Sequence, residues 1–137
     1  ETIYSFKPKF EQKIDSALTS VLVGMMKETL KSGTAASALT LGWSSPSAGK
    51  TGTTSDNKDA WFSGFTPYQT TIVWLGYDLG ASSQLTGASG AVPIWVELMK
   101  KYSAQWPASD FNFPDTVEKR EIDLHGTDKK IELIFKK

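Results

Sequence analysis

One short segment of the chain concentrates the groups that could do chemistry. Residues 48–54 read Ala-Gly-Lys-Thr-Gly-Thr-Thr and hold one cation, three hydroxyls and two glycines. A lysine can attract a carboxylate, threonine hydroxyls can hydrogen-bond it, and glycines let another backbone approach closely. Two enzymatic interpretations of the segment therefore compete with that of an ordinary Gly/Thr-rich edge strand.

The first interpretation is a phosphate-binding loop. Residues 49–51 match the end of the pattern G-x-x-x-x-G-K-[ST], but the pattern requires glycine where Ser44 stands. It also requires a helix immediately after Thr51, because the amides of that helix hold the phosphates. Gly52 and the turn-forming residues 55–57 (Ser-Asp-Asn) argue against a helix there, so this interpretation is disfavoured.

The second interpretation is the Lys-Thr-Gly strand of serine acyl enzymes, which include β-lactamases and penicillin-binding proteins. On an edge strand, free N–H and C=O groups can pair with an extended peptide. Because side chains alternate along a strand, Lys50 and Thr51 should leave opposite faces. They can serve one site only if the binding groove runs along the edge of the strand.

Further motifs surround this strand in a fixed order. Gly-Thr-Ala (33–35) precedes it. The motifs that follow are D-A-W-F (59–62), G-F-T-P (64–67), V-W-L-G-Y-D (73–78), T-G (86–87), S-G-A (89–91) and P-I-W (93–95). In this order the motifs resemble the C-terminal part of the transpeptidase domain of class A bifunctional penicillin-binding proteins. The resemblance covers about residues 14–99 and is much weaker in the tail from Trp106.

The resemblance implies a D,D-transpeptidase that crosslinks peptidoglycan stem peptides through a serine acyl-enzyme. Carried over to this sequence, Lys50 would be catalytic by holding the hydrogen-bond network of a second serine and making the cleft positive. The backbone N–H of Thr53 would supply half of the oxyanion hole, and the hydroxyls of Thr51 and Thr53 would bind the substrate carboxylate. The residues that the resemblance assigns to substrate binding are Thr51, Gly52, Thr53 and Thr54.

The family's nucleophile is the serine of an S-x-x-K motif on a helix, faced by an S-x-N motif. Both lie well before the Lys-Thr-Gly strand, and the chain begins too late to hold them. The resemblance therefore implies a fragment that is inactive without an upstream half of the domain. Residues 47–50 and 55–58 match S-x-x-K, but about one or two such matches arise by chance in a chain this rich in Ser and Lys. Ser47 and Ser55 are interpreted as coincidental matches.

The resemblance also sets the expected partners and location. The partners are a peptidoglycan stem peptide ending in D-Ala-D-Ala, β-lactams, and the upstream half of the same domain. The location is extracytoplasmic, with any membrane contact made through a segment outside this chain, and neither a cofactor nor a metal is expected. The alternative, from a different functional class, is a non-catalytic module that binds a stem peptide or an assembly partner.

The elements that must position the strand include two amphipathic helices, which the hydrophobic periodicity predicts. The first begins at Asp15 as N-cap and stops at Gly33, and residues 35–41 have room for one helical turn. The second spans about residues 91–105, after a Gly/Ser/Ala loop at residues 79–90.

Three antiparallel strands are expected between the helices, at residues 48–54, 60–66 and 70–77. The fold class is therefore α+β, an antiparallel sheet packed with helices. By resemblance it is part of the transpeptidase fold shared by serine β-lactamases and penicillin-binding proteins. Large aromatic residues on these elements are expected in the core, namely Trp61, Trp74 and Trp95.

The two ends carry weaker patterns. Residues 2–8 predict a short strand or extended arm, and residues 121–124 and 131–135 could pair as a terminal hairpin. Residues 1–106 are assigned to the C-terminal portion of the transpeptidase domain and residues 107–137 to a tail.

Composition narrows the functional class. The 137 residues carry 15 basic and 15 acidic side chains, which argues against a nucleic-acid partner because such proteins usually have a basic excess. The chain has no cysteine and one histidine, so a thiolate nucleophile is excluded and a His-dependent triad or multi-His metal site is disfavoured.

Overall fold

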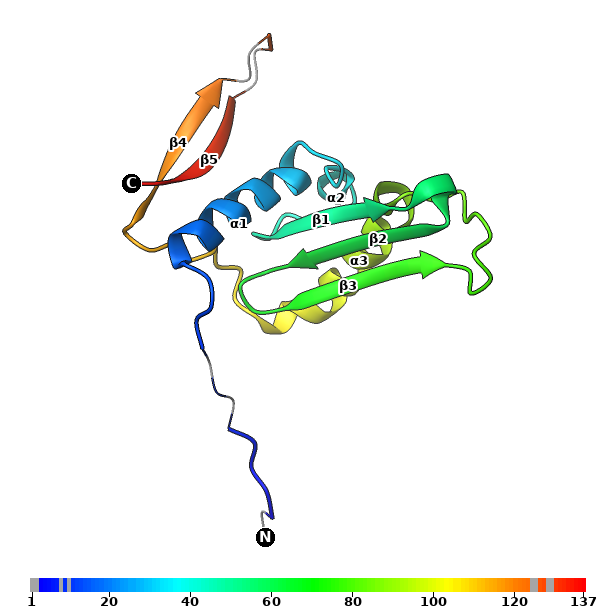
Figure 1. Ribbon diagram of the computed structural model, residues 1–137, viewed down its shortest axis with the longest axis horizontal. Coiled ribbons are helices and arrows are strands. Elements are labelled where there is room, and N and C mark those ends of the chain that lie inside the picture. The colour runs from blue at the N-terminus through cyan, green and yellow to red at the C-terminus, as the bar shows by residue number, and fades with distance from the viewer. Residues whose placement is uncertain (1–2, 8, 10, 124–125, 128–129) are drawn as a thin grey trace.

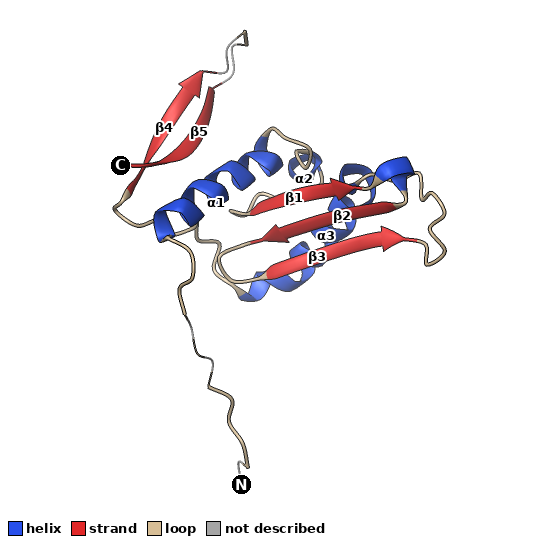
Figure 2. Cartoon of the chain, in the orientation of Figure 1, coloured by secondary structure: helices blue, strands red, loops and turns tan. Residues whose placement is uncertain are grey.

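The computed structural model describes residues 3–7, 9, 11–123, 126–127 and 130–137. Its helices and strands are α1 (Ser16–Lys31), α2 (Ser37–Thr40), β1 (Ala48–Thr53), β2 (Asp59–Phe65), β3 (Thr70–Gly76), α3 (Val92–Tyr102), β4 (Val117–Asp123) and β5 (Lys130–Lys136) (Figure 1). In Figure 2, α1 lies between the β4–β5 hairpin and the main sheet. The α+β class is confirmed.

The main sheet of the described chain has the strand order β1-β2-β3, with both pairs antiparallel. The predicted meander is therefore confirmed. Across the sheet, Lys50 lies opposite Ser63, while Thr51 lies opposite Phe62. Since directly opposed residues share a face, Lys50 belongs to the outer face of the sheet and Thr51 to the face that carries the core.

Helix α1 begins and ends where the sequence predicts. The Asp15 carboxylate accepts a hydrogen bond from the Leu18 N–H at 3.1 Å, which satisfies one of the free amides of the first turn. At the other end, the N–H groups of Ser32 and Gly33 both donate to the Glu28 carbonyl. Helix α2 falls within the predicted turn at residues 35–41.

The main core lies between the sheet and α3, which Figure 1 shows behind the sheet. The ring of Trp95 is fully buried and makes edge-on contacts with Trp43 and Phe62, at centroid distances of 5.3 and 5.2 Å. The prediction that Trp61 and Trp74 are also core residues is wrong. They face the other side of the sheet, 41% and 44% exposed, with their ring centroids 6.0 Å apart.

The segment before α3 is more ordered than the predicted loop. Residues Gly87–Ala91 form a turn of π-helix that leads directly into α3. The Thr86 hydroxyl accepts from the Ser89 N–H, and the Ser89 hydroxyl accepts from the Thr86 N–H, so the turn has a complete capping box. The α-helix ends at Tyr102, and residues 103–105, predicted as helix, form a 3₁₀ turn.

The C-terminal hairpin packs on α1 away from the sheet. Ala17, Val117 and Ile134 form a small buried cluster there, with Val21 and Phe113 packed against it. The pairing of β4 with β5 confirms the predicted hairpin, although Leu124, which was included in it, lies outside the described residues. The arm predicted at residues 2–8 forms no strand at residues 3–7, and Thr2 and Pro8 lie outside the described residues.

An ion pair ties the segment before the hairpin to α1. The Lys27 ammonium lies 2.6 and 2.7 Å from the two carboxylate oxygens of Asp110. Burial alone would raise the pKa of Asp110, but the hydrogen bonds from Lys27 and from the Phe111 N–H, with the charges of Lys27 and Lys119, lower it on balance. No helix among the described residues is long and apolar enough to cross a membrane.

Gly24 allows the close approach of the hairpin to α1, and its substitution tests that packing. A Cβ at Gly24 would lie 2.5 Å from Ile134 Cγ1. Gly24→Ala gains about 1 kcal/mol of helix propensity, whereas overpacking costs about 1–3 kcal/mol. We expect a net loss of about 1 kcal/mol in urea unfolding.

The matched control is the same substitution in an Ile134→Ala background. Shortening that side chain removes the 2.5 Å contact, while Cβ and the backbone N of residue 134 would still lie 3.0 and 3.3 Å from the new methyl group. Gly24→Ala should therefore destabilise this background less than it destabilises the wild type. Stabilisation by Gly24→Ala in both backgrounds would contradict the packing.

Candidate active site

The free edge of β1 is the feature on which the candidate site is built. Within the described residues, β1 pairs with β2 alone, so no strand pairs with the backbone groups of its other edge. The Thr54 N–H donates to the Asp59 carbonyl at 3.0 Å, so these two residues form a hydrogen-bonded pair of the β1–β2 ladder. Because bonded and non-bonded pairs alternate in antiparallel strands, the N–H groups of Thr51 and Thr53 face the free edge.

Lys50 also reaches this edge. Its side chain is exposed on the outer face, and its ammonium donates to the Thr51 carbonyl at 2.7 Å. Since the Thr51 carbonyl faces away from β2, the cation is folded over the edge of the strand. Lys50 and Thr51 leave opposite faces, as predicted, yet both place polar groups at one edge.

The hydroxyls of Thr51 and Thr53 lie on the other face, and each contacts a different loop. The Thr51 and Thr34 hydroxyl oxygens are 2.6 Å apart. The Thr53 hydroxyl accepts a hydrogen bond from the Gly87 N–H at 3.0 Å. Thr34 and Gly87 occur in the sequence motifs, but no sequence pattern indicated that they touch these hydroxyls, because both contacts are non-local.

Gly87 is required by close approach to the sheet. A Cβ at this position would lie 2.3 Å from the Trp61 carbonyl oxygen and 2.8 Å from that of Gly52. Both obstacles are backbone atoms of paired strands and cannot move aside easily. Any larger residue would therefore push the Thr86–Gly87 loop off the sheet and break its contact with Thr53.

Thr54 differs from the other residues of the segment. Its hydroxyl donates to an Asp59 carboxylate oxygen at 3.0 Å and accepts from the Asp59 N–H at 2.8 Å. The other oxygen of Asp59 accepts from the Trp74 indole N–H at 3.0 Å. These contacts, here called the Thr54–Asp59–Trp74 clasp, hold the β1–β2 turn. The substrate-binding role expected of Thr54 stays a prediction.

The serines of the two S-x-x-K matches have structural surroundings. Ser47 is buried, accepts from the Trp43 indole N–H at 2.9 Å and donates to the Ser45 carbonyl at 3.1 Å. Ser55 begins a 3₁₀ turn whose residues Asp56 and Asn57 have φ of 59° and 52°. Thr51 lies inside a strand, so the helix that a phosphate loop requires is not formed there.

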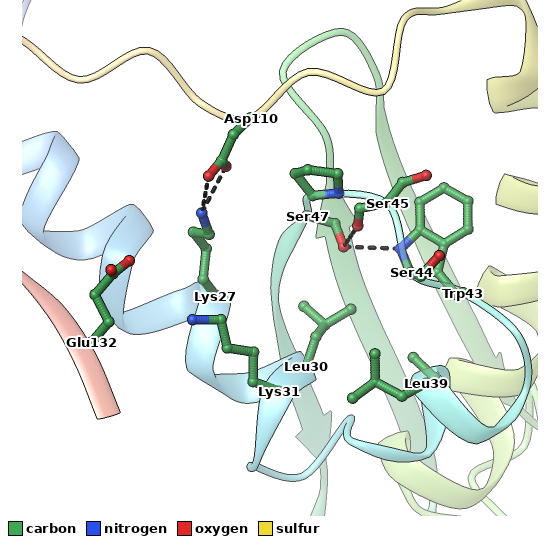
Figure 3. A pocket seen from close by; sticks show the side chains of 12 residues that line it. Lys27, Leu30, Lys31, Leu39, Trp43, Ser44, Ser45, Ser47, Asp110 and Glu132 are labelled. Atoms are coloured by element: carbon green, nitrogen blue, oxygen red, sulfur yellow. Dashed lines mark hydrogen bonds and ion pairs between the residues drawn. The ribbon is translucent and has the colours of Figure 1, made fainter. Parts of the chain in front are cut away.

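A cavity of about 280 Å³ lies elsewhere, between α1, α2 and the 43–47 linker. Figure 3 shows its apolar floor at Leu30 and Leu39 and the Lys27–Asp110 ion pair at its rim. No residue of β1 lines it. The described part of the chain contains no cluster of three or more His, Asp or Glu side chains that could hold a metal ion.

The fold is that of the penicillin-binding-protein transpeptidases. The crystal structure of penicillin-binding protein 1A from Haemophilus influenzae superposes on 88% of this chain with a TM-score of 0.72 and 24% identity, over 20% of that chain. No family model matches the sequence.

Sequence comparison with curated relatives identifies the family. Penicillin-binding protein 1A of Aquifex aeolicus is 41% identical over 109 residues, which is 78% of this chain and 15% of the relative. That of Neisseria lactamica is 42% identical over 108 residues, or 77% and 13%. The chain thus spans less than a sixth of the length of these relatives. It belongs to the class A penicillin-binding proteins, as a stretch of their transpeptidase region.

The Thr54–Asp59–Trp74 clasp can be tested by Asp59→Ala. This substitution removes the acceptor of two hydrogen bonds at the end of β1, so we expect a loss of about 1–2 kcal/mol in urea unfolding. Asp78→Ala, at an exposed carboxylate just after β3, is the matched control and should change stability by less than about 0.5 kcal/mol. Equal effects of the two substitutions would show that the clasp contributes nothing.

Proposed function

We propose that β1 is the substrate-binding and oxyanion strand of a peptidoglycan D,D-transpeptidase, which crosslinks stem peptides through a serine acyl-enzyme and is acylated by β-lactams. The main support is the free edge of β1, over which the Lys50 ammonium folds. The hydroxyls of Thr51 and Thr53 lie on the adjoining inner face, each hydrogen-bonded to a neighbouring loop. The membership of the chain in the class A penicillin-binding proteins supports it.

The free edge suits an extended peptide that ends in D-Ala-D-Ala. Such a peptide adds to an exposed edge as a further strand, and Gly52 lies between the two residues whose N–H groups face that edge. When the nucleophilic serine attacks the penultimate D-Ala carbonyl, negative charge develops on the carbonyl oxygen. The Thr53 N–H, which faces the edge, donates to that oxygen, and one such donor lowers the barrier by about 3 kcal/mol. The N–H of the nucleophilic serine is the second donor.

The polar side chains of β1 have separate roles in binding the substrate. The hydroxyls of Thr51 and Thr53 bind the terminal carboxylate of the stem peptide, or the carboxylate of a β-lactam in its place. The Lys50 ammonium makes the cleft positive and holds the hydrogen bonds of the S-x-N serine. Thr54 borders the site and anchors the strand. The departing D-Ala takes a proton, and an amine of a neighbouring stem peptide then takes the acyl group.

The groups that complete the reaction belong to an upstream half of the domain. We infer that this half supplies the S-x-x-K and S-x-N motifs and that the chain is inactive without it. Residues 1–106 form the C-terminal portion of the transpeptidase domain, and residues 107–137 form a tail that includes β4 and β5. The protein acts outside the cytoplasm, where peptidoglycan lies, with neither a metal nor a cofactor in the reaction.

A second candidate function is a module that binds a stem peptide or an assembly partner without turnover. It is favoured by the placement of Ser47 in the core and of Ser55 in a turn, since neither lies on an S-x-x-K helix. The coding sequence upstream of this stretch separates the two. S-x-x-K and S-x-N motifs there support the enzyme, and a natural start near residue 1 supports the binding module.

Lys50→Ala in a full-length protein containing this stretch tests the catalytic role of the cation. Acylation by a fluorescent penicillin, followed on a denaturing gel, should fall by about 100-fold or more, since hydrogen bonds to a charged group contribute about 1.5–3 kcal/mol each. The melting temperature should change little, because the side chain is exposed. Lys58→Ala, at an exposed lysine of the second S-x-x-K match, should leave acylation unchanged. Near-normal acylation of Lys50→Ala would refute the role.

The same penicillin tests the assignment of the nucleophile. This chain alone should take no covalent label, and label should appear on the upstream half once that half is supplied. Labelling of this chain that disappears in Ser47→Ala or Ser55→Ala would mean that one of these serines is a real nucleophile.

A further inference from the structure

The contact between the hydroxyls of Thr34 and Thr51 extends the site beyond β1. We propose that Thr34 is a positioning residue that aims the proton of the Thr51 hydroxyl at the carboxylate of the substrate or β-lactam. The inference rests on the proposed function, in which Thr51 binds that carboxylate. It concerns a residue 17 positions upstream of Thr51, on the loop between α1 and α2.

The direction of its hydrogen bonds decides whether a hydroxyl can bind a carboxylate. A threonine hydroxyl has one proton to donate and two lone pairs that accept. A carboxylate only accepts, so each hydroxyl that binds it must give its single proton to it. A hydroxyl that is already engaged can do so only if its other partner is a donor.

Thr53 meets this condition. Its partner is the Gly87 N–H, which can only donate, so the proton of the Thr53 hydroxyl stays available for a ligand. Thr51 meets the condition only when Thr34 donates. At 2.6 Å either hydroxyl can be the donor, and a carboxylate beside Thr51 favours donation from Thr34, because chained hydrogen bonds strengthen one another. The bound carboxylate therefore sets the direction of the hydrogen bond between the two hydroxyls, with Thr34 donating to Thr51.

The backbone holds Thr34 in place for this role. On one side the Gly33 N–H donates to the Glu28 carbonyl at 2.9 Å, and on the other the Ala35 N–H donates to the Thr29 carbonyl at 2.9 Å. Ala35 is fully buried, while Thr34 itself is exposed. An exposed side chain on an anchored backbone can face a ligand in the cleft without cost to the core.

Thr34→Val in a full-length protein containing this stretch removes the donor and keeps the shape of the side chain. Acylation rate constants are compared for benzylpenicillin and for its methyl ester, which lacks the carboxylate. We expect Thr34→Val to lower the rate constant for benzylpenicillin about five- to tenfold and that for the ester by less than about twofold. Thr34→Ser, which keeps a hydroxyl at this position, should have a rate constant for benzylpenicillin close to that of the wild type. If the branched valine disturbs folding, Thr34→Ala gives the same comparison.

Two further variants separate the possible failures. Thr70→Val, at an exposed threonine at the far end of β3, is the control and should act like wild type. Thr51→Val should lower the benzylpenicillin rate constant selectively, and by more than Thr34→Val does. If Thr51→Val changes the rate constants for benzylpenicillin and its methyl ester by the same factor, the proposed carboxylate site is wrong. If Thr51→Val is selective but Thr34→Val has no effect or slows both substrates equally, the site stands and the positioning role of Thr34 is overturned.

Discussion

The pairing of β1 with β2 in a single register is the constraint on which the site depends. A slip of one residue would exchange the two faces and the two edges of β1. Lys50 would then point into the core, and the Thr53 N–H would face β2 in place of the open edge. The Thr54–Asp59–Trp74 clasp fixes this register at the end nearest the site. Outside the clasp, β1 carries small or polar residues, so packing alone specifies its register weakly.

Helix α1 connects β1, the loop that carries Thr34 and the C-terminal hairpin. Helix α1 contacts β1 on one side and the C-terminal hairpin on the other. Its buried Leu30 belongs to the main core, while its buried Ala17 belongs to the hairpin cluster. One helix therefore positions the Thr34 loop against β1 and anchors the tail through Gly24 and Lys27. The tail thus stabilises the helix from which that loop starts, although it lies away from β1.

Much of this arrangement could be predicted from the sequence, because it rests on local patterns. Strand β3 is rich in β-branched and aromatic residues, Asp15 is a good N-cap, and the Lys-Thr-Gly segment has an unusual composition. The exposure of Trp61 and Trp74 was not predictable, because hydrophobicity does not say which face of a sheet is left uncovered. Nor were the contacts of Thr34 and Gly87 with β1, since no local pattern encodes a pairing between loops distant in sequence.

The most direct test of the role of β1 is a crystal structure of the penicillin acyl-enzyme of a full-length protein that contains this stretch. We predict that the acyl carbonyl oxygen accepts a hydrogen bond from the Thr53 N–H. We also predict that the penicillin carboxylate accepts from the hydroxyls of Thr51 and Thr53, with Thr34 still in contact with Thr51. An acyl group whose carbonyl and carboxylate lie away from the edge of β1 would contradict this role.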